Sequence, residues 1–154
     1  MNVRPLGGLR HVGHLARRFA LSLSRRPPAA VDTQWALASL LPGEAALWQR
    51  LSSADRRHSI QVARRFLEAW PAATRDEVAG ALLHDVGKLA SELGTFARVV
   101  ATVVGPRTAR FRRYHDHERL GVELMAAAGS SAATVELTLG RGPAASALRA
   151  ADDL

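Results

Sequence analysis

The sequence predicts a single all-α domain, a compact helical bundle, that follows a basic N-terminal extension. From Asp32 onward, apolar residues recur at helical spacing, and no segment shows a sustained alternation of apolar and polar residues. The chain has 154 residues, which is enough for one domain with a sizeable core. We place the extension and its linker at residues 1–30 and the helical domain at residues 31–154.

The extension differs from the rest of the chain in charge. Residues 1–28 contain six Arg and no acidic residue, and residues 6–24 have the spacing of an amphipathic helix. Three interpretations fit this segment: a loosely docked extension, a helix in peripheral contact with an anionic membrane surface, or an organellar presequence or partner-binding arm. The paired prolines within residues 25–30 cannot continue a helix, so we predict a linker there.

The net charge of +7 arises largely from this extension. It holds six of the 21 basic residues, which leaves 15 basic against 14 acidic residues in the remainder of the chain. The predicted domain is therefore not a polycation, and we do not expect nucleic acid to be its partner.

The absence of Cys limits the chemistry of the chain. It excludes disulfides, a thiol nucleophile and thiolate metal ligands, so a metal must be held by His and carboxylate side chains. No apolar run approaches the roughly 20 residues that a membrane-spanning helix needs. Together these features lead us to expect a cytoplasmic protein.

Three helices are predicted in the first half of the domain. The first covers about residues 32–41, the second has Pro42 in its first turn, and the third covers about residues 54–70 with Ser52 or Ser53 as its N-cap. The residues expected to form the core are Trp35, Leu37, Leu40 and Leu41 in the first helix, Ala46, Leu47 and Leu51 in or after the second, and Ile60, Val62, Ala63, Phe66 and Leu67 in the third.

The second half begins with a capping box, Thr74 to Glu77, which starts a helix that we expect to run into His84 and Asp85. Gly87 would then let the backbone turn away. Further helices are predicted at about residues 94–104, 116–128 and 131–139, with a last one from Pro143 onward. Val99–Val104 is β-branched like a strand, but its apolar residues also fit a helical period. Gly121 indicates close packing between helices.

Four residues on three predicted helices have side chains that bind metals. His58 lies on the third helix, His84 and Asp85 stand together at the end of the next, and Asp152 lies on the last. Each has a structural alternative, since a His beside a core or an Asp at a helix end is common. Taken together, two imidazoles and two carboxylates suit a divalent ion such as Mn²⁺, Fe²⁺, Co²⁺, Ni²⁺, Zn²⁺ or Mg²⁺. Arg57, next to His58, is a weaker candidate for contacting an anionic substrate, and we expect instead a surface ion pair with Asp55 or Glu68.

The order of these residues resembles the signature of the HD superfamily of metal-dependent phosphohydrolases, an all-helical fold. The resemblance covers about residues 50–154, and the matching segments are 58–63, 81–88, 117–121 and 150–152. The resemblance implies that one divalent ion is bound by His58, His84, Asp85 and Asp152.

The resemblance also implies roles for individual side chains. The bound ion would activate a water molecule and polarise a phosphoryl oxygen, and Asp85 would both ligate the ion and orient that water. Lys88, the one lysine of the chain, would offer a positive charge to a phosphate, or it is a solvated cation at a helix end. His117 would bind phosphate or stabilise the leaving oxygen, or it is a surface residue.

The chain departs from the family pattern in one respect. Many relatives carry a further His or a His-His pair after the helix of His117, whereas residues 136–143 contain none. We therefore expect one metal ion and not two. Asp152 is near the end of the sequence, and fraying of its helix would weaken metal binding.

These observations support a leading hypothesis and two alternatives. The leading hypothesis is a hydrolase that uses metal-activated water to cleave a small phosphorylated substrate, such as a nucleotide. The first alternative is a regulatory module that binds metal or nucleotide without turnover. The second is a nucleic-acid-binding protein that acts through the Arg-rich extension, in which Phe19 is the only aromatic residue.

Overall fold

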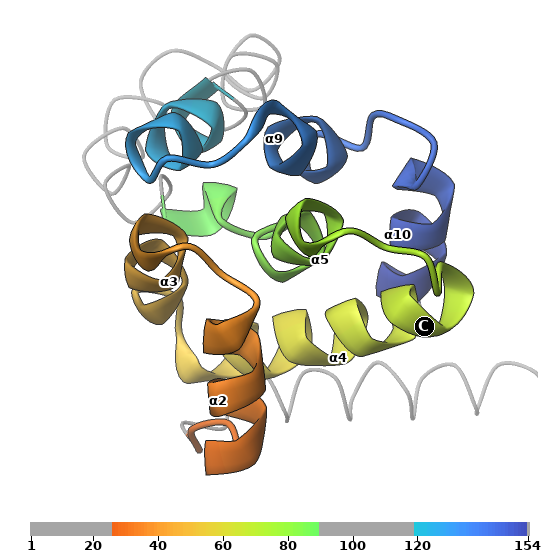
Figure 1. The fold of residues 1–154 in the computed structure, drawn as a ribbon. Coiled ribbons are helices and arrows are strands. Elements are labelled where there is room, and N and C mark those ends of the chain that lie inside the picture. Colours follow the sequence, from red (N-terminus) through yellow and green to blue (C-terminus); the bar gives the residue numbers. More distant parts are fainter. Residues whose placement is uncertain (1–25, 90–118, 154) are drawn as a thin grey trace, which may run out of the picture.

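The computed structural model describes residues 26–89 and 119–153, and in these ranges it is an all-α bundle without strands (Figure 1). A further helical segment covers residues 119–127. The other helices are α2 (Ala30–Ala38), α3 (Pro42–Gln49), α4 (Ser53–Ala69), α5 (Arg75–Leu82), α9 (Ala132–Thr138) and α10 (Ala145–Asp152). The predicted fold class is confirmed. The predicted helices at residues 6–24 and 94–104 lie outside the described residues.

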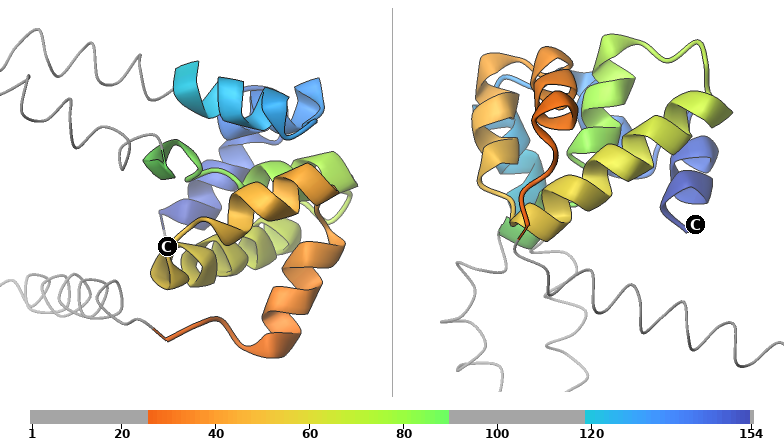
Figure 2. Two further views of the ribbon diagram at one scale, coloured as in Figure 1. Left: turned by 90° about the vertical axis from the view of Figure 1, so that its left-hand side faces the viewer. Right: turned by 90° about the horizontal axis from the view of Figure 1, so that it is seen from below.

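Helix α5 occupies the centre of the bundle. It packs against α4 on one side and α9 on the other, and α10 packs along α4. The two further views agree that α2 and α3 lie on one side of the bundle and α10 on the opposite side (Figure 2). The C-terminal helix is therefore brought beside a helix that precedes it by more than 70 residues in the sequence.

Side-chain N-caps define the starts of three helices, and those of α4 and α5 were predicted from the sequence. The Ser52 hydroxyl accepts a hydrogen bond from the backbone N–H of Asp55 at 3.1 Å, at the start of α4. Thr74 and Glu77 form the predicted capping box at the start of α5, and Ser131 caps α9. Each cap satisfies backbone N–H groups that have no partner inside the helix.

The core around α2 and α3 differs from the prediction at three residues. Helix α2 ends at Ala38, so Leu41 is extended, donates its N–H to Glu44 Oε2 at 2.8 Å and is 37% exposed. Leu41 is therefore not a core residue. Ala46 is exposed as well, and Trp48, which the prediction did not include, is fully buried.

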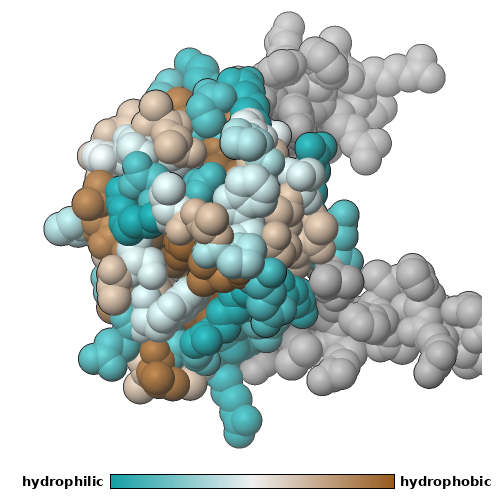
Figure 3. Space-filling model, turned by 45° about the vertical axis from the view of Figure 1, so that its right-hand side comes forward, coloured by the Kyte–Doolittle hydropathy of each residue, from teal (hydrophilic) through white to brown (hydrophobic). Residues whose placement is uncertain are grey.

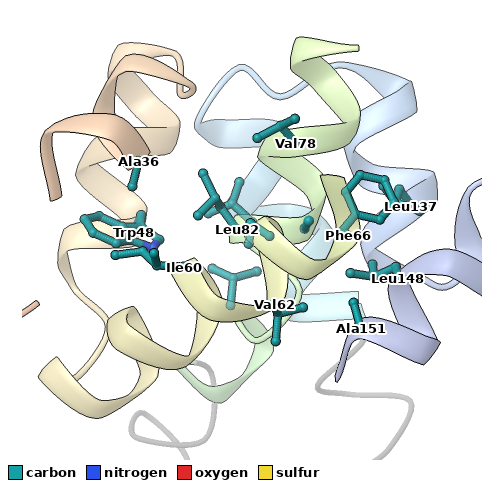
Figure 4. Close-up of a cluster of buried hydrophobic side chains, with 14 of the residues drawn as sticks. Ala36, Trp48, Ile60, Val62, Phe66, Val78, Leu82, Leu137, Leu148 and Ala151 are labelled. Atoms are coloured by element: carbon teal, nitrogen blue, oxygen red, sulfur yellow. The ribbon is translucent and has the colours of Figure 1, made fainter. Parts of the chain in front are cut away.

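The core is continuous from α2 and α3 to α10 (Figure 4). The predicted apolar face of α4 is confirmed: four of its five residues are buried and Leu67 is partly buried against them. On the α3 side, the indole of Trp48 donates to Ser59 Oγ at 2.9 Å, which gives the buried N–H a partner. The largest fully buried apolar side chains are those of Trp48, Phe66, Leu82, Leu83 and Met125.

Three of the described glycines mark close packing in the bundle, and the tightest is Gly43, where a Cβ would collide with the carbonyl oxygen of Ala128. A Cβ at Gly80 of α5 would lie 3.1 Å from the carbonyl oxygen of Thr134 in α9, so a larger residue would separate these helices. A Cβ at Gly121 would lie 3.6 Å from the Cα of Gly87. The predicted close packing at Gly121 is confirmed, and its neighbour is the segment that directly follows Asp85.

The surface is mixed in character. On the face drawn in Figure 3, hydrophilic and hydrophobic residues are intermixed over the coloured part of the molecule. None of the helices in the described ranges combines the length and the hydropathy needed to cross a membrane.

Candidate metal centre

Three segments that are distant in sequence meet at one point on the bundle. His58 comes from α4, His84 from the turn of residues 83–86 that follows α5, and Asp152 from the last turn of α10. One donor atom of each side chain lies within 4.8 Å of the donor atoms of the other two. The fold thus brings together three of the four residues predicted to bind a metal.

The Asp152 carboxylate lies between the two imidazoles. Its Oδ1 is 2.9 Å from Nε2 of His58 and 3.6 Å from Nε2 of His84. The two rings are arranged edge to face, with 5.4 Å between their centroids and 63° between their planes. The donor nitrogens of both rings therefore point toward the same oxygen.

The His84 ring is oriented by the end of α5. Its Nδ1 lies 2.8 Å from the carbonyl oxygen of Ala81. Because a carbonyl oxygen can only accept, Nδ1 carries the proton, and in the neutral ring Nε2 has a free lone pair. Nε2 is buried and has no hydrogen-bond partner among the described residues. Metal-binding histidines are commonly fixed in this way, with one nitrogen bonded to a carbonyl and the other left for the ion.

The local backbone differs from the prediction. Helix α5 ends at Leu82 and does not run into the His84–Asp85 pair, which lies in the turn. Gly87 belongs to a helical stretch at residues 87–89, and among the described glycines only 129, 140 and 142 have positive φ. The chain therefore turns before Gly87, and the lack of a side chain there serves the close approach of Gly121.

The cluster favours a positive charge between its donor atoms. Burial alone would lower the pKa of His84, but the Asp152 and Asp85 carboxylates and the Ala81 carbonyl outweigh burial, and the pKa is raised. The imidazole of His84, together with that of His58, holds the pKa of Asp152 well below its usual range, against the opposing effect of burial. The carboxylates of Asp152 and Asp85 thus favour positive charge at His84.

The spacing of the donor atoms fits a single ion. Donor atoms bound about 2.0 to 2.2 Å from one ion are separated by roughly 2.8 to 3.6 Å at octahedral or tetrahedral angles. The separations from Asp152 Oδ1 to the two imidazole nitrogens, 2.9 and 3.6 Å, lie at the two ends of this range. These two separations fit one ion, and all three donor atoms lie within 4.8 Å of one another.

Asp85, the fourth predicted ligand, is engaged elsewhere. Its Oδ2 accepts a hydrogen bond from Nζ of Lys88 at 2.6 Å, and the same oxygen lies 3.6 Å from Nε2 of His84. Asp85 thus borders the cluster, but its carboxylate is directed to Lys88.

Lys88 is shared between two carboxylates. Besides Asp85, its Nζ donates to Oδ1 of Asp55 at 3.2 Å, and the Lys88 side chain is 54% exposed. Burial alone would lower the pKa of Lys88, but the hydrogen bonds and charges of both carboxylates outweigh burial and raise it. The contact between Asp55 and Lys88 was not predicted from the sequence. The sequence did contain one indication of a role for Asp55: it lies one helical turn before His58, which places Asp55 and His58 on the same face of α4.

His117, which was predicted to bind phosphate or stabilise the leaving oxygen, lies outside the described residues.

The helix of Asp152, for which fraying was predicted, is packed against the bundle. Helix α10 packs on α4 through Leu148 and Ala151, both at least 90% buried, and Arg65 of α4 donates to the Ala151 carbonyl at 3.4 Å. These contacts anchor the residue directly before Asp152.

Comparison of the chain with protein-family models, curated proteins and solved structures found no match. The resemblance to the HD superfamily accordingly stays a prediction, based on the order of the motif residues.

Proposed function

We propose that this protein is a metal-dependent phosphohydrolase of the HD type that acts on a small phosphorylated substrate, such as a nucleotide. The observation that carries the proposal is the buried Nε2 of His84. It has no hydrogen-bond partner among the described residues, its tautomer is set by Ala81, and it lies beside the imidazole of His58 and the carboxylate of Asp152. A buried polar atom without a partner is costly unless a ligand completes it.

The proposed site uses four side chains of this chain. His58, His84 and Asp152 hold the ion, and Asp85 turns its Oδ2 from Lys88 toward it. When bound, a divalent ion supplies an activated water molecule as the nucleophile and positive charge for the phosphoryl oxygens. Two nitrogen and two oxygen donors suit Mn²⁺, Fe²⁺, Co²⁺, Ni²⁺ or Zn²⁺ better than Mg²⁺, which prefers oxygen.

Lys88 is the proposed contact for the substrate phosphate. Its ammonium lies 2.6 Å from a carboxylate oxygen of Asp85, next to the cluster, and the side chain is more than half exposed. A lysine acts on phosphate as a point charge and does not need a fixed geometry.

A second candidate function is a binding module without turnover. The observation that favours it is the pairing of Lys88 with two carboxylates. These carboxylates neutralise the positive charge that Lys88 is proposed to offer to the substrate phosphate. In that case the site binds metal or nucleotide as a regulatory domain.

Metal analysis tests the proposed site. The protein is purified without an affinity tag, stripped with a chelator, and reloaded with Mn²⁺, Co²⁺, Ni²⁺ or Zn²⁺ before bound metal is counted. We expect one ion per chain in the wild type and none in His84→Ala or Asp152→Asn. The matched control is Asp153→Asn, which removes the adjacent, exposed carboxylate of the same helix end and is expected to keep the ion.

Phosphate release tests the activity. The loaded protein is assayed against nucleoside phosphates, sugar phosphates and an aryl phosphate. We expect turnover in the wild type and none in Asp85→Ala with an unchanged helical spectrum. A protein that takes up no metal and releases no phosphate would overturn the proposal. Metal uptake with thermal stabilisation by a nucleotide, but without product, would establish the binding module instead.

A further inference from the structure

Lys88 and the proposed metal ion would compete for the same carboxylate, that of Asp85. One oxygen, Oδ2 of Asp85, lies 2.6 Å from the Lys88 ammonium and 3.6 Å from the metal-facing nitrogen of His84. If this carboxylate serves the ion, it shares its negative charge with a divalent cation. Lys88 then loses most of that attraction and is repelled by the ion itself.

Asp55 is the second anchor of the lysine, and its own position is secured. Its Oδ1 accepts from Lys88 Nζ at 3.2 Å, while its Oδ2 accepts from the Ser52 hydroxyl at 2.6 Å. The backbone N–H of Asp55 in turn donates to that hydroxyl, at 3.1 Å. The carboxylate is thus held at the first turn of α4 by contacts that involve none of the proposed ligands.

The charge state of Asp55 agrees with this geometry. Burial alone would raise the pKa of Asp55, but the hydrogen bond from Ser52 and the charge of Lys88 outweigh burial and lower it. A carboxylate that stays ionised keeps its attraction for an ammonium group. Asp55 is also one turn before His58 on α4, so a side chain that it holds remains next to the cluster.

We propose that Asp55 is the positioning residue for Lys88 in the metal-loaded protein. When Asp85 turns to the ion, Asp55 keeps the ammonium beside the site, where it meets the phosphate of the substrate. Asp55 itself contacts neither the ion nor the phosphate. This inference rests on the proposed function, since it requires a metal at the cluster and an anion at Lys88.

The chain offers a direct probe, because Lys88 is its only lysine. In tag-free protein grown with ¹³C,¹⁵N-labelled lysine, every lysine signal comes from this side chain. A held ammonium gives two distinct Hε signals and an observable NH₃⁺ group, whereas a freely rotating one gives averaged Hε signals and rapid proton exchange. We expect the metal-loaded wild type to show two distinct Hε signals and an observable NH₃⁺ group for Lys88. Metal-loaded Asp55→Asn should show averaged Hε signals.

The second readout is the affinity of the metal-loaded protein for inorganic phosphate, measured by calorimetry. We expect Asp55→Asn and Lys88→Met each to weaken phosphate binding by about tenfold, the effect of losing one charge-assisted contact. The double variant should be no weaker than Lys88→Met, because both changes remove one interaction. Metal affinity should stay close to that of the wild type in all three.

Two further variants separate positioning from a general structural effect. Asp55→Glu keeps a carboxylate at the third position after the Ser52 cap, as in a capping box, and should restore part of the phosphate affinity. Asp32→Asn removes another ion-paired aspartate from the first turn of a helix, α2, and should change neither readout. If Asp55→Asn does not fold, Asp55→Glu carries the test, and failure of that variant to hold Lys88 or bind phosphate better than Lys88→Met overturns the proposal.

The outcomes distinguish this inference from the proposed function. A wild type that takes up no divalent metal overturns the proposed function and this role with it. Normal metal uptake, together with wild-type phosphate binding and a held Lys88 in Asp55→Asn, overturns only the positioning role. Loss of the metal itself in Asp55→Asn also overturns it, since Asp55 would then be part of the metal site.

Discussion

The two ends of α5 carry polar clusters of different kinds. At the N-terminal end, Thr74 and Glu77 accept hydrogen bonds from each other's backbone N–H groups at 2.8 and 3.2 Å, and Arg75 pairs with the buried Glu44 of α3 at 2.7 Å. At the C-terminal end, His84 bonds to the last turn of α5 through one nitrogen and directs the other to residues of α4 and α10.

The two clusters differ in their role: the first stabilises the fold, and the second gathers the donor atoms of the candidate metal site. The hydrogen bonds at the N-terminal end satisfy the helix backbone and compensate a carboxylate in the core, so their loss affects folding. The cluster at the C-terminal end assembles donor atoms and leaves one of them without a partner among the described residues, so we expect its loss to affect the proposed metal binding. We therefore expect variants at the two ends to separate stability from metal affinity, and the following predictions run from the largest effect to the smallest.

His84→Ala should lower metal affinity most. Loss of an outer-shell partner typically costs 10- to 100-fold in metal affinity, so loss of a ligand should cost about 100-fold or more. The free energy of unfolding of the metal-free protein should fall by only about 1 kcal/mol, the value of one hydrogen bond. Calorimetric metal titration and chemical denaturation in a chelator measure the two quantities. Metal affinity that survives this change would place the ion elsewhere.

Arg75→Ala should lower stability without changing metal affinity. It leaves the carboxylate of Glu44, which is fully buried, without its charged partner. Because the Arg75 side chain is 38% exposed, we expect about 2 kcal/mol, less than the 3 to 5 kcal/mol typical of a fully buried pair.

Urea denaturation of Arg75→Ala measures this loss, and the exposed pair of Arg141 with Glu136 provides the matched control. Arg141→Ala should change the free energy of unfolding by less than about 0.5 kcal/mol. Equal effects of the two substitutions would show that the Glu44 pair is no more important than a surface contact.

Thr74→Ala should cost about 1 kcal/mol of stability, because it removes the N-cap of α5. Thr74→Ser retains the hydroxyl and should be close to wild type. Both should bind metal normally, as measured by calorimetry, because the helix end at Leu82 keeps its packing. A loss of metal affinity in Thr74→Ala would mean that the two ends of α5 are coupled.

The pH dependence of the metal-free protein should be the smallest of these effects. The raised pKa of His84 adds stability that is full below its ordinary pKa of 6.5 and is lost as the pH rises through the folded value. The lowered pKa of Asp152 adds stability above its ordinary value of 3.8, and this is lost as the pH falls toward the folded value. Wild type should therefore exceed Asp152→Asn in stability most clearly between these two pH values.

Thermal unfolding in a chelator across this pH range gives the comparison. The difference in melting temperature between wild type and Asp152→Asn should shrink as the pH rises through the raised pKa of His84 and the ring loses its proton. Asp153→Asn should follow the wild-type curve. A difference that is constant with pH would show that His84 and Asp152 do not share a charge interaction.

The N-terminal end of α5 could be predicted from sequence because its contacts are mostly local. Thr74 and Glu77 are three residues apart, and their spacing alone indicates the cap. The apolar face of α4 follows in the same way from its period. Leu41 and Trp48 were predicted wrongly or missed, because the end of α2 at Ala38 and the burial of an indole against Ser59 depend on neighbouring helices.

The C-terminal end could be predicted only in part. The sequence predicted which residue types belong to the candidate site, and three of the four predicted ligands lie together. It did not predict that Asp85 pairs with Lys88, or that Asp55 supplies a second carboxylate from a position 33 residues earlier. Such contacts depend on how α4 lies against the turn after α5, and no periodicity encodes that.

The sequence by itself determined the all-α fold and the caps of α4 and α5, because these depend on spacings within one helix, and the order of His58, His84, Asp85 and Asp152 along the chain predicted the donor residues. The tertiary structure decided which donors meet. The packing of α10 along α4 brings Asp152 within 2.9 Å of His58, 94 residues away, and the end of α5 at Leu82 turns His84 toward both. Proximity between distant segments comes from the packing of apolar faces, and the chemistry of the candidate site is a consequence of that packing.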